Sequence, residues 1–402
     1  MKTIAWPLDD AEIDEALRAL QFRHCKWDLY TRGRQSILPD ALVLSEDEHD
    51  ELTRAAEDVW RALRQLEAAV LRDAEALAGV GVPAGLYRAL AEERAGSPRV
   101  TRCDFHPTPE GSWLISEFNE DAPTGFAEAE GLCSVLADSF EDRAAGLRFV
   151  GDLKGAVTAA LAPFERVGLV FPTGYSEDLQ HVALVSEWLS EHGHRTVLGS
   201  PANLIMDGGR AAIFDQPVQA LFRYFPGEAI PELDNAGDWE GASRTLPMMN
   251  SLSATVAQSK RFYAAPNEHD LALPTEARDT IAAHVPTTLY LRPSRRDQLM
   301  TERERWVLKG AFGRMGDAIC MGAALTPEDW ERVIDAALAE ADQIAVQEWF
   351  DTAPHWFSHG LGYPTVGAFL VDGRFAGYYS RVSKNPVIDY ESRYVPTLVE
   401  VS

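Results

Sequence analysis

Residues 99–119 read RVTRCDFHPTPEGSWLISEFN and contain two runs of alternating apolar and polar residues around a turn. Proline and glycine residues fill the turn, so the pattern predicts a β-hairpin with the strands RVTRCDF and WLISEFN. Successive side chains of a strand point to opposite faces. We therefore expect Arg102 and Asp104 to share one face of the first strand, and Glu117 and Asn119 to share one face of the second.

These four polar residues form the first candidate site. Mg²⁺ prefers oxygen ligands in octahedral geometry and usually binds through one or two carboxylates together with substrate phosphates. Asp104, Glu117 and Asn119 offer two carboxylates and an amide. Arg102 could pair with a transferring phosphoryl group or an acyl-phosphate. A solvent-facing polar stripe is the alternative, but the aromatic and aliphatic neighbours of these residues favour a site.

The segments on either side of the hairpin predict an α/β protein with a helical N-terminal region. From Asp9 to Leu90, apolar residues recur at three- and four-residue spacing, with an interruption at KWDLYTRGRQSILPDALVLS. From Glu165 to about Asp234, short apolar strands alternate with an amphipathic helix, which predicts a small parallel sheet. This part lacks a GxGxxG turn, which argues against a dinucleotide site.

The last third of the sequence contains a candidate phosphate-binding segment, WVLKGAFGRMGDAI. Lys309 ends a predicted strand that runs into a turn with Gly313 and Gly316. Such glycines let backbone N–H groups approach phosphate oxygens, and the lysine supplies a point charge. The segment lacks the GxxxxGK[ST] order of a Walker loop. A tight hairpin whose glycines need positive φ explains the same residues equally well.

Two further stretches of strand are predicted after this segment. IAVQEWF ends in four residues that could offer backbone groups to a nucleobase edge and apolar side chains to its face. They are Gln347, Glu348, Trp349 and Phe350. A buried strand terminus is the alternative. Residues 364–383, PTVGAFLVDGRFAGYYSRVS, are expected to form one long strand.

The composition restricts the partners of the protein. Its 37 Lys and Arg residues against 62 Asp and Glu give a formal charge of −25, which repels nucleic acids and anionic membranes and attracts a cationic amine. No apolar run approaches the ~20 residues that span a bilayer. The N-terminus has no apolar signal core and the four cysteines form no CxxC pair, so we expect a cytoplasmic protein with reduced thiols.

Several of these segments together resemble the glutathionylspermidine synthetase family. RCDFHPTPEGSWLISEFNEDAPTGFAEAEGL resembles its R-x-D and E-x-N-x-D-x-P-T block, and WVLKGAFGRMGDAI resembles its V-L-K-P-x-x-G-R-x-G block. Further segments are similar in VFPTGYSEDLQHVALVSEWLSEHGH, FRYFP, QEWF and GRFAGYYSRVSKNPVIDYESRYVP. The matches follow the family order from Arg102 to Pro396, with the metal-ligand block before the ATP-lysine block. The resemblance is to the synthetase part of the family, without its amidase domain.

The resemblance implies an α/β ATP-grasp fold of the glutathionylspermidine synthetase type and a ligase that depends on ATP and Mg²⁺. Such a ligase joins a small carboxylate, an amino acid or peptide, to an amine such as a polyamine through an acyl-phosphate. One unit, 1–402, would comprise a helical region at 1–95, the metal-ligand hairpin and a helix at 96–160, a parallel-sheet pre-ATP-grasp-like subdomain at 161–255 and a nucleotide-binding region at 256–402.

The same resemblance implies roles for individual residues. It assigns Mg²⁺ to Asp104, Glu117 and Asn119, charge stabilisation in the transition state to Arg102, and contact with the reacting carboxylate to Arg381. The ATP site would comprise Lys260, Lys309, Gly313, Gly316, Gln347, Glu348, Trp349 and Phe350. The amine pocket would include Glu177 and Asp178, whose alternative role is to complement the dipole at a helix N-terminus.

The sequence departs from the family pattern in three places. Gly310 replaces a proline, and Thr397 stands where a histidine is expected. Lys260 lies in AQSKRFY and not in the Asn-Lys context of the family. Two alternatives to a ligase stay open. The first is a catalytically silent nucleotide-binding paralogue, and the second is a small-molecule kinase that stops after phosphoryl transfer.

Overall fold

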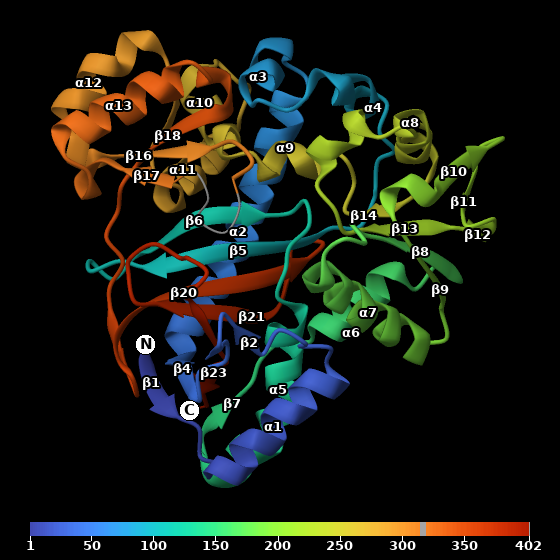
Figure 1. Cartoon of the computed structure of the whole chain (residues 1–402), viewed down its shortest axis with the longest axis vertical. Coiled ribbons are helices and arrows are strands. Elements are labelled where there is room, and N and C mark those ends of the chain that lie inside the picture. The colour runs from blue at the N-terminus through green and yellow to red at the C-terminus, as the bar shows by residue number, and fades with distance from the viewer. Residues whose placement is uncertain (314–318, 402) are drawn as a thin grey trace.

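The computed structural model describes residues 1–313 and 319–401 and confirms a mixed α/β fold. At its centre lies an antiparallel sheet, the central sheet, with strand order β22, β21, β20, β5 and β6 and with β19 paired to β20 (Figure 1). Its strands are β5 (Val100–Pro107), β6 (Trp113–Asn119), β19 (His355–Phe357), β20 (Gly360–Val371), β21 (Arg374–Ser383) and β22 (Arg393–Val395).

Strands β5 and β6 are the predicted hairpin. Arg102 lies opposite Asn119 and Asp104 lies opposite Glu117, and the register shifts after Asp104. Directly opposed residues of an antiparallel pair have their side chains on the same face. The four polar groups therefore share one face of the central sheet, as the alternation predicted.

Residues 364–383 were expected to form one strand, but the structure divides them between two strands. Strands β20 and β21 pair as a hairpin around Asp372 and Gly373, whose φ angles are 48° and 76°. A two-residue hairpin turn with positive φ at both positions commonly has the sequence Asp-Gly. The turn is also closely packed, because a Cβ on Gly373 would lie 2.5 Å from the Trp60 ring.

A second antiparallel sheet, the upper sheet, lies above the central sheet in Figure 1. Its strand order is β15, β18, β16 and β17. A core cluster that includes Trp306 and Trp330 fixes the helices α12 (Arg296–Thr301) and α13 (Pro327–Leu338) to it. The strands are β15 (Thr288–Tyr290), β16 (Trp306–Gly310), β17 (Ile319–Met321) and β18 (Ile344–Glu348). Lys309 and Gln347 thus stand on neighbouring strands of one sheet.

The predicted parallel sheet is also present, with strand order β14, β13, β8 and β9. Helix α7 (Ser176–Glu191) connects β8 to β9, as the alternation of strand and helix predicted. The parallel strands are β8 (Arg166–Val170), β9 (Arg195–Gly199), β13 (Ala220–Arg223) and β14 (Met248–Met249). A small antiparallel sheet beside it contains β10 (Leu204–Asp207), β11 (Arg210–Ile213) and β12 (Gln216–Val218).

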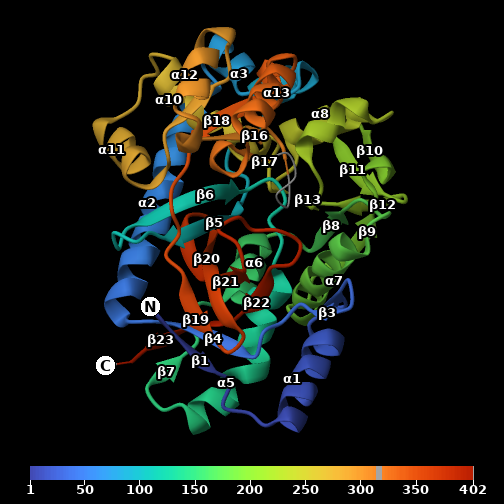
Figure 2. The same ribbon diagram turned by 60° about the vertical axis from the view of Figure 1, so that its left-hand side comes forward.

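The N-terminal region is helical in α1 (Asp10–Arg23) and α2 (Glu46–Val70), as expected, but it also contributes strands. Strand β4 (Asp40–Leu44) is buried at every residue and pairs with β1 (Lys2–Ala5) and with β23 (Thr397–Glu400). Short apolar runs of this kind fit a buried strand or a buried helix. The pairing brings the two ends of the chain close together (Figure 2).

Helix α2 supports the central sheet. It begins at Ser45, which forms a reciprocal capping box with Glu48. Its apolar side packs in the largest core cluster together with residues of the central sheet such as Val366 and Tyr378. Within the described ranges, no helix is both long and apolar enough to cross a membrane.

Candidate functional site

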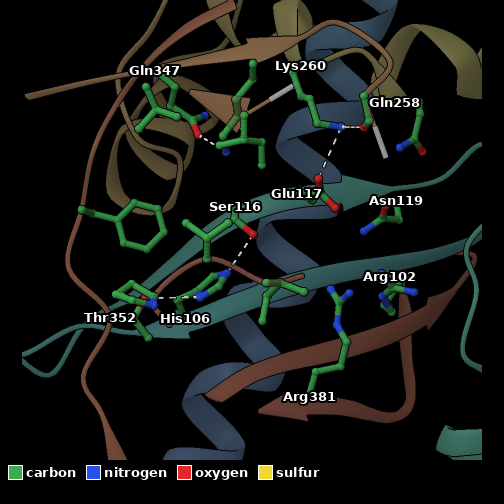
Figure 3. A pocket seen from close by; sticks show the side chains of 18 of the residues that line it. Arg102, His106, Ser116, Glu117, Asn119, Gln258, Lys260, Gln347, Thr352 and Arg381 are labelled. Carbon is green, nitrogen blue, oxygen red and sulfur yellow. Dashed lines mark hydrogen bonds and ion pairs between the residues drawn. The ribbon is translucent and has the colours of Figure 1, made fainter. Parts of the chain in front are cut away.

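A cleft lies between the central sheet and the upper sheet (Figure 3). Its non-protein space, including the open mouth, is about 1240 Å³. Residues of β5, β6 and β21 form the lower wall, and residues of β16, β17 and β18 form the upper wall. The predicted site residues that line it are Arg102, Glu117, Asn119, Lys260, Lys309, Gly313, Gln347, Glu348, Trp349, Phe350 and Arg381.

The other predicted site residues lie elsewhere. Asp104 is fully buried beneath the lower wall. Glu177 and Asp178 stand in the first turn of α7, beside the parallel sheet, and do not belong to the lining of the cleft as described. Gly316 falls outside the described residues, so its predicted role stays a prediction.

Asp104 holds two arginines together in the lower wall. Its Oδ1 accepts a hydrogen bond from Arg102 Nε at 2.6 Å, and its Oδ2 accepts from Arg102 Nη2 at 2.9 Å and from Arg381 Nη2 at 2.8 Å. Burial would raise the pKa of Asp104, but the two guanidinium groups outweigh it and hold the pKa below its ordinary value. We call Arg102, Asp104 and Arg381 the arginine triad. It has one net positive charge.

The arginine triad has a hydrogen-bond donor that is available to an anion. The guanidinium carbons of Arg102 and Arg381 lie 4.4 Å and 5.3 Å from the ring centroid of Tyr379, which supports both side chains. Arg381 Nε is buried, and no hydrogen-bond partner for it exists among the described residues. A buried donor without a partner costs free energy unless a ligand or water satisfies it.

Glu117 and Asn119 present oxygen atoms to the cleft. Asn119 donates its Nδ2 to Asp104 Oδ2 at 3.2 Å, which leaves its amide oxygen as an acceptor. Glu117 Oε1 lies 3.4 Å from Lys260 Nζ. Burial would raise the pKa of Glu117, but Lys260 and other cations keep it below its ordinary value, so the side chain is anionic.

These oxygens fit a divalent cation that also binds phosphate. Mg²⁺ usually takes only one or two protein carboxylates and fills its remaining positions with water and phosphate oxygens. The described residues contain no group of three His, Cys, Asp or Glu side chains that could hold a metal alone. Glu117 and Asn119 could supply one carboxylate and one amide oxygen to such an ion. Asp104 could join them only by exchanging its arginine contacts.

Lys309 is a buried cation in the upper wall with a neutral partner. Its Nζ donates to Gln347 Oε1 at 2.6 Å, and Gln347 Nε2 donates to Thr288 Oγ1 at 3.0 Å. Burial lowers the pKa of Lys309 to about 8, although Glu117 partly opposes the shift. Lys260 Nζ lies nearby and donates to the carbonyl oxygen of Gly313 at 2.8 Å. The upper wall thus presents two lysines to the cleft.

The structure adds lining residues that the sequence analysis did not identify. His106 follows Asp104 by one strand repeat; its Nε2 and Ser116 Oγ are 2.8 Å apart, and burial lowers its pKa to about 4. Its ring meets the edge of Phe350 at a centroid distance of 5.5 Å. The two-residue period could have extended the site to His106. No sequence pattern indicates the other added lining residues, which are Gln258, Thr352, Pro386, Val387 and Ile388.

Glu177 and Asp178 occupy the N-terminal turn of α7, where acidic side chains complement the helix dipole. Burial and the nearby charge of Asp28 raise the pKa of Glu177. This environment fits either role proposed for the pair, so their part in binding an amine stays a prediction.

Comparisons with known proteins show the family of the chain and a structural relative. The model of the family described as glutathionylspermidine synthase preATP-grasp matches residues 14–400. A solved structure of a glutathione synthetase like-effector (GSS30) from Globodera pallida, in its apo form, is similar with a TM-score of 0.66 and 12% identity. The match covers 97% of this chain and 98% of that chain, so the two chains share a fold.

A second solved structure, a putative gamma-glutamylcysteine synthetase from Methylobacillus flagellatus, matches with a TM-score of 0.46 and 12% identity. That match covers 80% of this chain and 82% of the other. None of the curated proteins matches the chain in sequence.

Proposed function

Because this chain belongs to the glutathionylspermidine synthase preATP-grasp family, we propose that it is an ATP-dependent ligase that joins a carboxylate to an amine through an acyl-phosphate. One observation supports this proposal most directly. Two lysines on the upper wall and the two arginines of the triad on the lower wall face the same cleft. Phosphates held by the lysines would meet a carboxylate held by the arginines.

The upper wall would hold ATP. Residues 347–350 end a strand beside the cleft, where backbone groups and the Trp349 and Phe350 rings could contact the nucleobase. Lys309 and Lys260 would face the phosphates, with Gly313 close to Lys260. Gly316 is proposed to contribute its backbone N–H to the phosphates.

Glu117 and Asn119, and Asp104 after it releases an arginine, would hold Mg²⁺. When bound, the ion would neutralise charge on the phosphates of ATP. Lys260 could then contact phosphate, because the metal ion would replace it as the partner of Glu117, whose Oε1 lies 3.4 Å from Lys260 Nζ. Arg102 and Arg381 would orient the acid substrate and stabilise the charge of its phosphorylated form.

The proposed reaction has two steps. An oxygen of the substrate carboxylate attacks the γ-phosphorus, the bond from phosphorus to the β–γ bridging oxygen breaks, and ADP leaves. A neutral amine then attacks the acyl carbon, the bond to the phosphate oxygen breaks, and the nitrogen loses a proton to water. The products are an amide, ADP and phosphate. Positioning and fixed charge would account for the catalysis, without a protein nucleophile.

The substrates are proposed by class only. The acid would be an amino acid or a short peptide, and the amine would be a small cation such as a polyamine. The formal charge of −25 favours the approach of a cationic amine. Glu177 and Asp178 remain candidates for its recognition.

Trapping of the acyl-phosphate tests the proposal. The purified chain is incubated with ATP, Mg²⁺ and a panel of amino acids and short peptides, with hydroxylamine in place of the amine. We expect a hydroxamate, ADP release, and transfer of oxygen-18 from the labelled carboxylate to phosphate. ADP release without hydroxamate would favour a kinase of a hydroxyl group, and release of AMP and pyrophosphate would contradict the ATP-grasp mechanism.

A further inference from the structure

A second charged cluster lies behind the arginine triad. Lys26 is 1% exposed, and its Nζ lies 2.7 Å from Asp28 Oδ1 and 2.6 Å from Glu128 Oε1. Its ammonium group also stands 4.6 Å from the centroid of the Tyr394 ring. His181, on α7, lies against the same group of charges. We call Lys26, Asp28, Glu128 and His181 the lysine cluster.

Within or beside the lysine cluster lie buried polar atoms that no described residue satisfies. Glu128 Oε2, His181 Nδ1 and the neighbouring Tyr224 hydroxyl are buried and have no hydrogen-bond partner in the part of the chain that the structure describes. These three residues are 5%, 4% and 2% exposed. Buried polar groups are nearly always paired in folded proteins. Three unpaired atoms, one of them on the buried Glu128 carboxylate, therefore indicate a place that a polar ligand fills.

The charge of the lysine cluster specifies the sign of that ligand. Two carboxylates face one ammonium group, and burial lowers the pKa of His181 to about 4, which keeps its ring neutral at pH 7. The cluster thus has one net negative charge. A cationic group of a ligand would be attracted to this charge, whereas an anionic group would be repelled. The free atoms suit a cation too, because Glu128 Oε2 accepts, and the His181 ring and Tyr224 hydroxyl can accept.

Two aromatic rings connect the lysine cluster to the arginine triad. Tyr379 lies under both arginines, its ring centroid is 5.5 Å from that of Tyr394, and Tyr394 contacts Lys26. The segment that carries Glu128 also carries Thr124, which lines the cleft and accepts hydrogen bonds from Arg102. The positive triad and the negative cluster are thus neighbouring sites of opposite charge.

We propose that the lysine cluster is a subsite for an ammonium group of a substrate whose reacting end lies at the arginine triad. The inference rests on the proposed ligase activity and adds the residues that recognise a second functional group. The ammonium group would belong either to the acid substrate, as in a zwitterionic peptide, or to the far end of a diamine. Lys26 itself shows that the two carboxylates can hold an ammonium group.

Glu128→Gln tests the subsite, because it removes the charge and keeps the shape. Glu130→Gln is the matched control, since Glu130 lies on the same turn but accepts from the backbone N–H of Lys154 at 3.2 Å. Asp28→Asn provides a second variant of the cluster at a more exposed position. Loss of a charge-assisted hydrogen bond to a buried ammonium group should raise the KM of the ligand by about ten- to a hundredfold.

Two pairs of probes distinguish the sources of the ammonium group. Glycylglycine and N-acetylglycylglycine are compared as acids in the hydroxamate assay, and 1,4-diaminobutane and n-butylamine are compared as amines in the complete reaction. In one of the two pairs, we expect Glu128→Gln and Asp28→Asn to raise the KM of only the probe that has the extra ammonium group. The KM for ATP should not change, and Glu130→Gln should resemble the wild type.

Calorimetric titration of the same four probes measures binding apart from catalysis. Binding of an ammonium-bearing probe that depends on Glu128, without any hydroxamate, would support the subsite and contradict the proposed ligase activity. Hydroxamate formation with equal binding of all four probes to the wild type and to both cluster variants would overturn the subsite and leave the ligase proposal intact. An absence of Glu128-dependent binding in every assay would overturn it as well.

Discussion

The two walls of the cleft hold their positive charges in different ways. In the lower wall, Asp104 binds both Arg102 and Arg381, at distances of 2.6–2.9 Å. In the upper wall, Lys309 has the neutral amide of Gln347 as its hydrogen-bond partner, and burial lowers its pKa to about 8. The lower wall therefore has charges of fixed position, whereas no carboxylate among the described residues contacts Lys309 directly.

This difference matches the two tasks that the ligase proposal requires. A reacting carboxylate must be oriented, and a guanidinium pair clamped by a carboxylate is a rigid element for that purpose. A triphosphate brings several negative charges, and a desolvated lysine gains most when such an anion arrives. Lys260 is intermediate, since its Nζ has both a charged and a neutral partner. It lies 3.4 Å from Glu117 Oε1 and donates to the carbonyl oxygen of Gly313 at 2.8 Å.

The largest effect is expected from removal of a lower-wall charge. Arg102→Ala should reduce hydroxamate formation and oxygen-18 transfer together, by about 10³- to 10⁵-fold, the range seen when an arginine that stabilises a transferring phosphoryl group is lost. Arg374→Ala is the control, because Arg374 is an exposed arginine on the same strand as Arg381. Label transfer at the wild-type rate in Arg102→Ala would remove Arg102 from the mechanism.

The clamp itself should contribute to stability. Asp104→Asn leaves two buried guanidinium groups without their carboxylate, which should lower the free energy of unfolding by about 3–5 kcal/mol. Glu117→Gln should change stability by less than about 1 kcal/mol, since Glu117 lies at the cleft surface, but it should raise the Mg²⁺ concentration for half-maximal activity. Urea unfolding and a Mg²⁺ titration measure both effects. Equal stability of the two variants would contradict the clamp.

The upper wall should behave in the opposite way, with a cost in stability and a gain in binding. A fall in pKa from 10.5 to about 8 means that charged Lys309 costs the folded state about 3 kcal/mol at pH 7. Lys309→Met should remove much of this cost and raise the melting temperature, while ATP binds more weakly. Calorimetry with ATP and thermal unfolding measure the two effects. A variant that is both less stable and unchanged in ATP affinity would contradict this account.

The pH dependence of Lys309 has a definite sign. The lysine is protonated below pH 8 and loses its charge as pH rises through its folded pKa, so kcat/KM for ATP should fall above about pH 8. Stability should change in the other direction. Between pH 8 and 10.5 the unfolded chain binds more protons at this lysine than the folded chain, so its contribution to the free energy of unfolding rises with pH. Comparison with Lys309→Met isolates both contributions.

The lower wall could be predicted from the sequence further than the upper wall. The two-residue period around Arg102 and Glu117 is enough to place the polar groups on one face, because a strand allows only two faces. That Asp104 lies beneath the cleft and binds two arginines could not be predicted, since Arg381 is far away in sequence. Strand β4 was hidden for a related reason, because its partner β23 comes from the other end of the chain.

The environment of Lys309 also depends on contacts that a sequence does not specify. A strand lysine before a glycine turn indicates a phosphate site only weakly, since a hairpin explains the same glycines. Its burial and its bond to Gln347 come from the pairing of β16 with β18. This pairing places Val307 opposite Gln347, and Lys309 lies two residues further along β16 on the same face. The lysine cluster is a clearer case, because Lys26, Glu128 and His181 come from three distant segments.

The smallest effect, and the sharpest test of the contrast between the walls, is expected from Gln347→Glu. This change gives Lys309 a carboxylate partner, which it lacks among the described residues. The pKa of Lys309 should rise, so the fall in kcat/KM for ATP should move to a pH about one unit higher, while ATP affinity at pH 7 drops severalfold because the phosphates must displace an ion pair. Gln343→Glu is the matched control, since it adds the same charge at an exposed residue just before β18. If both variants shifted the profile equally, the change would reflect the overall charge of the protein, and the neutral partner of Lys309 would have no special role. A shift confined to Gln347→Glu would show that the upper wall keeps its lysine unpaired by a carboxylate in order to bind phosphate.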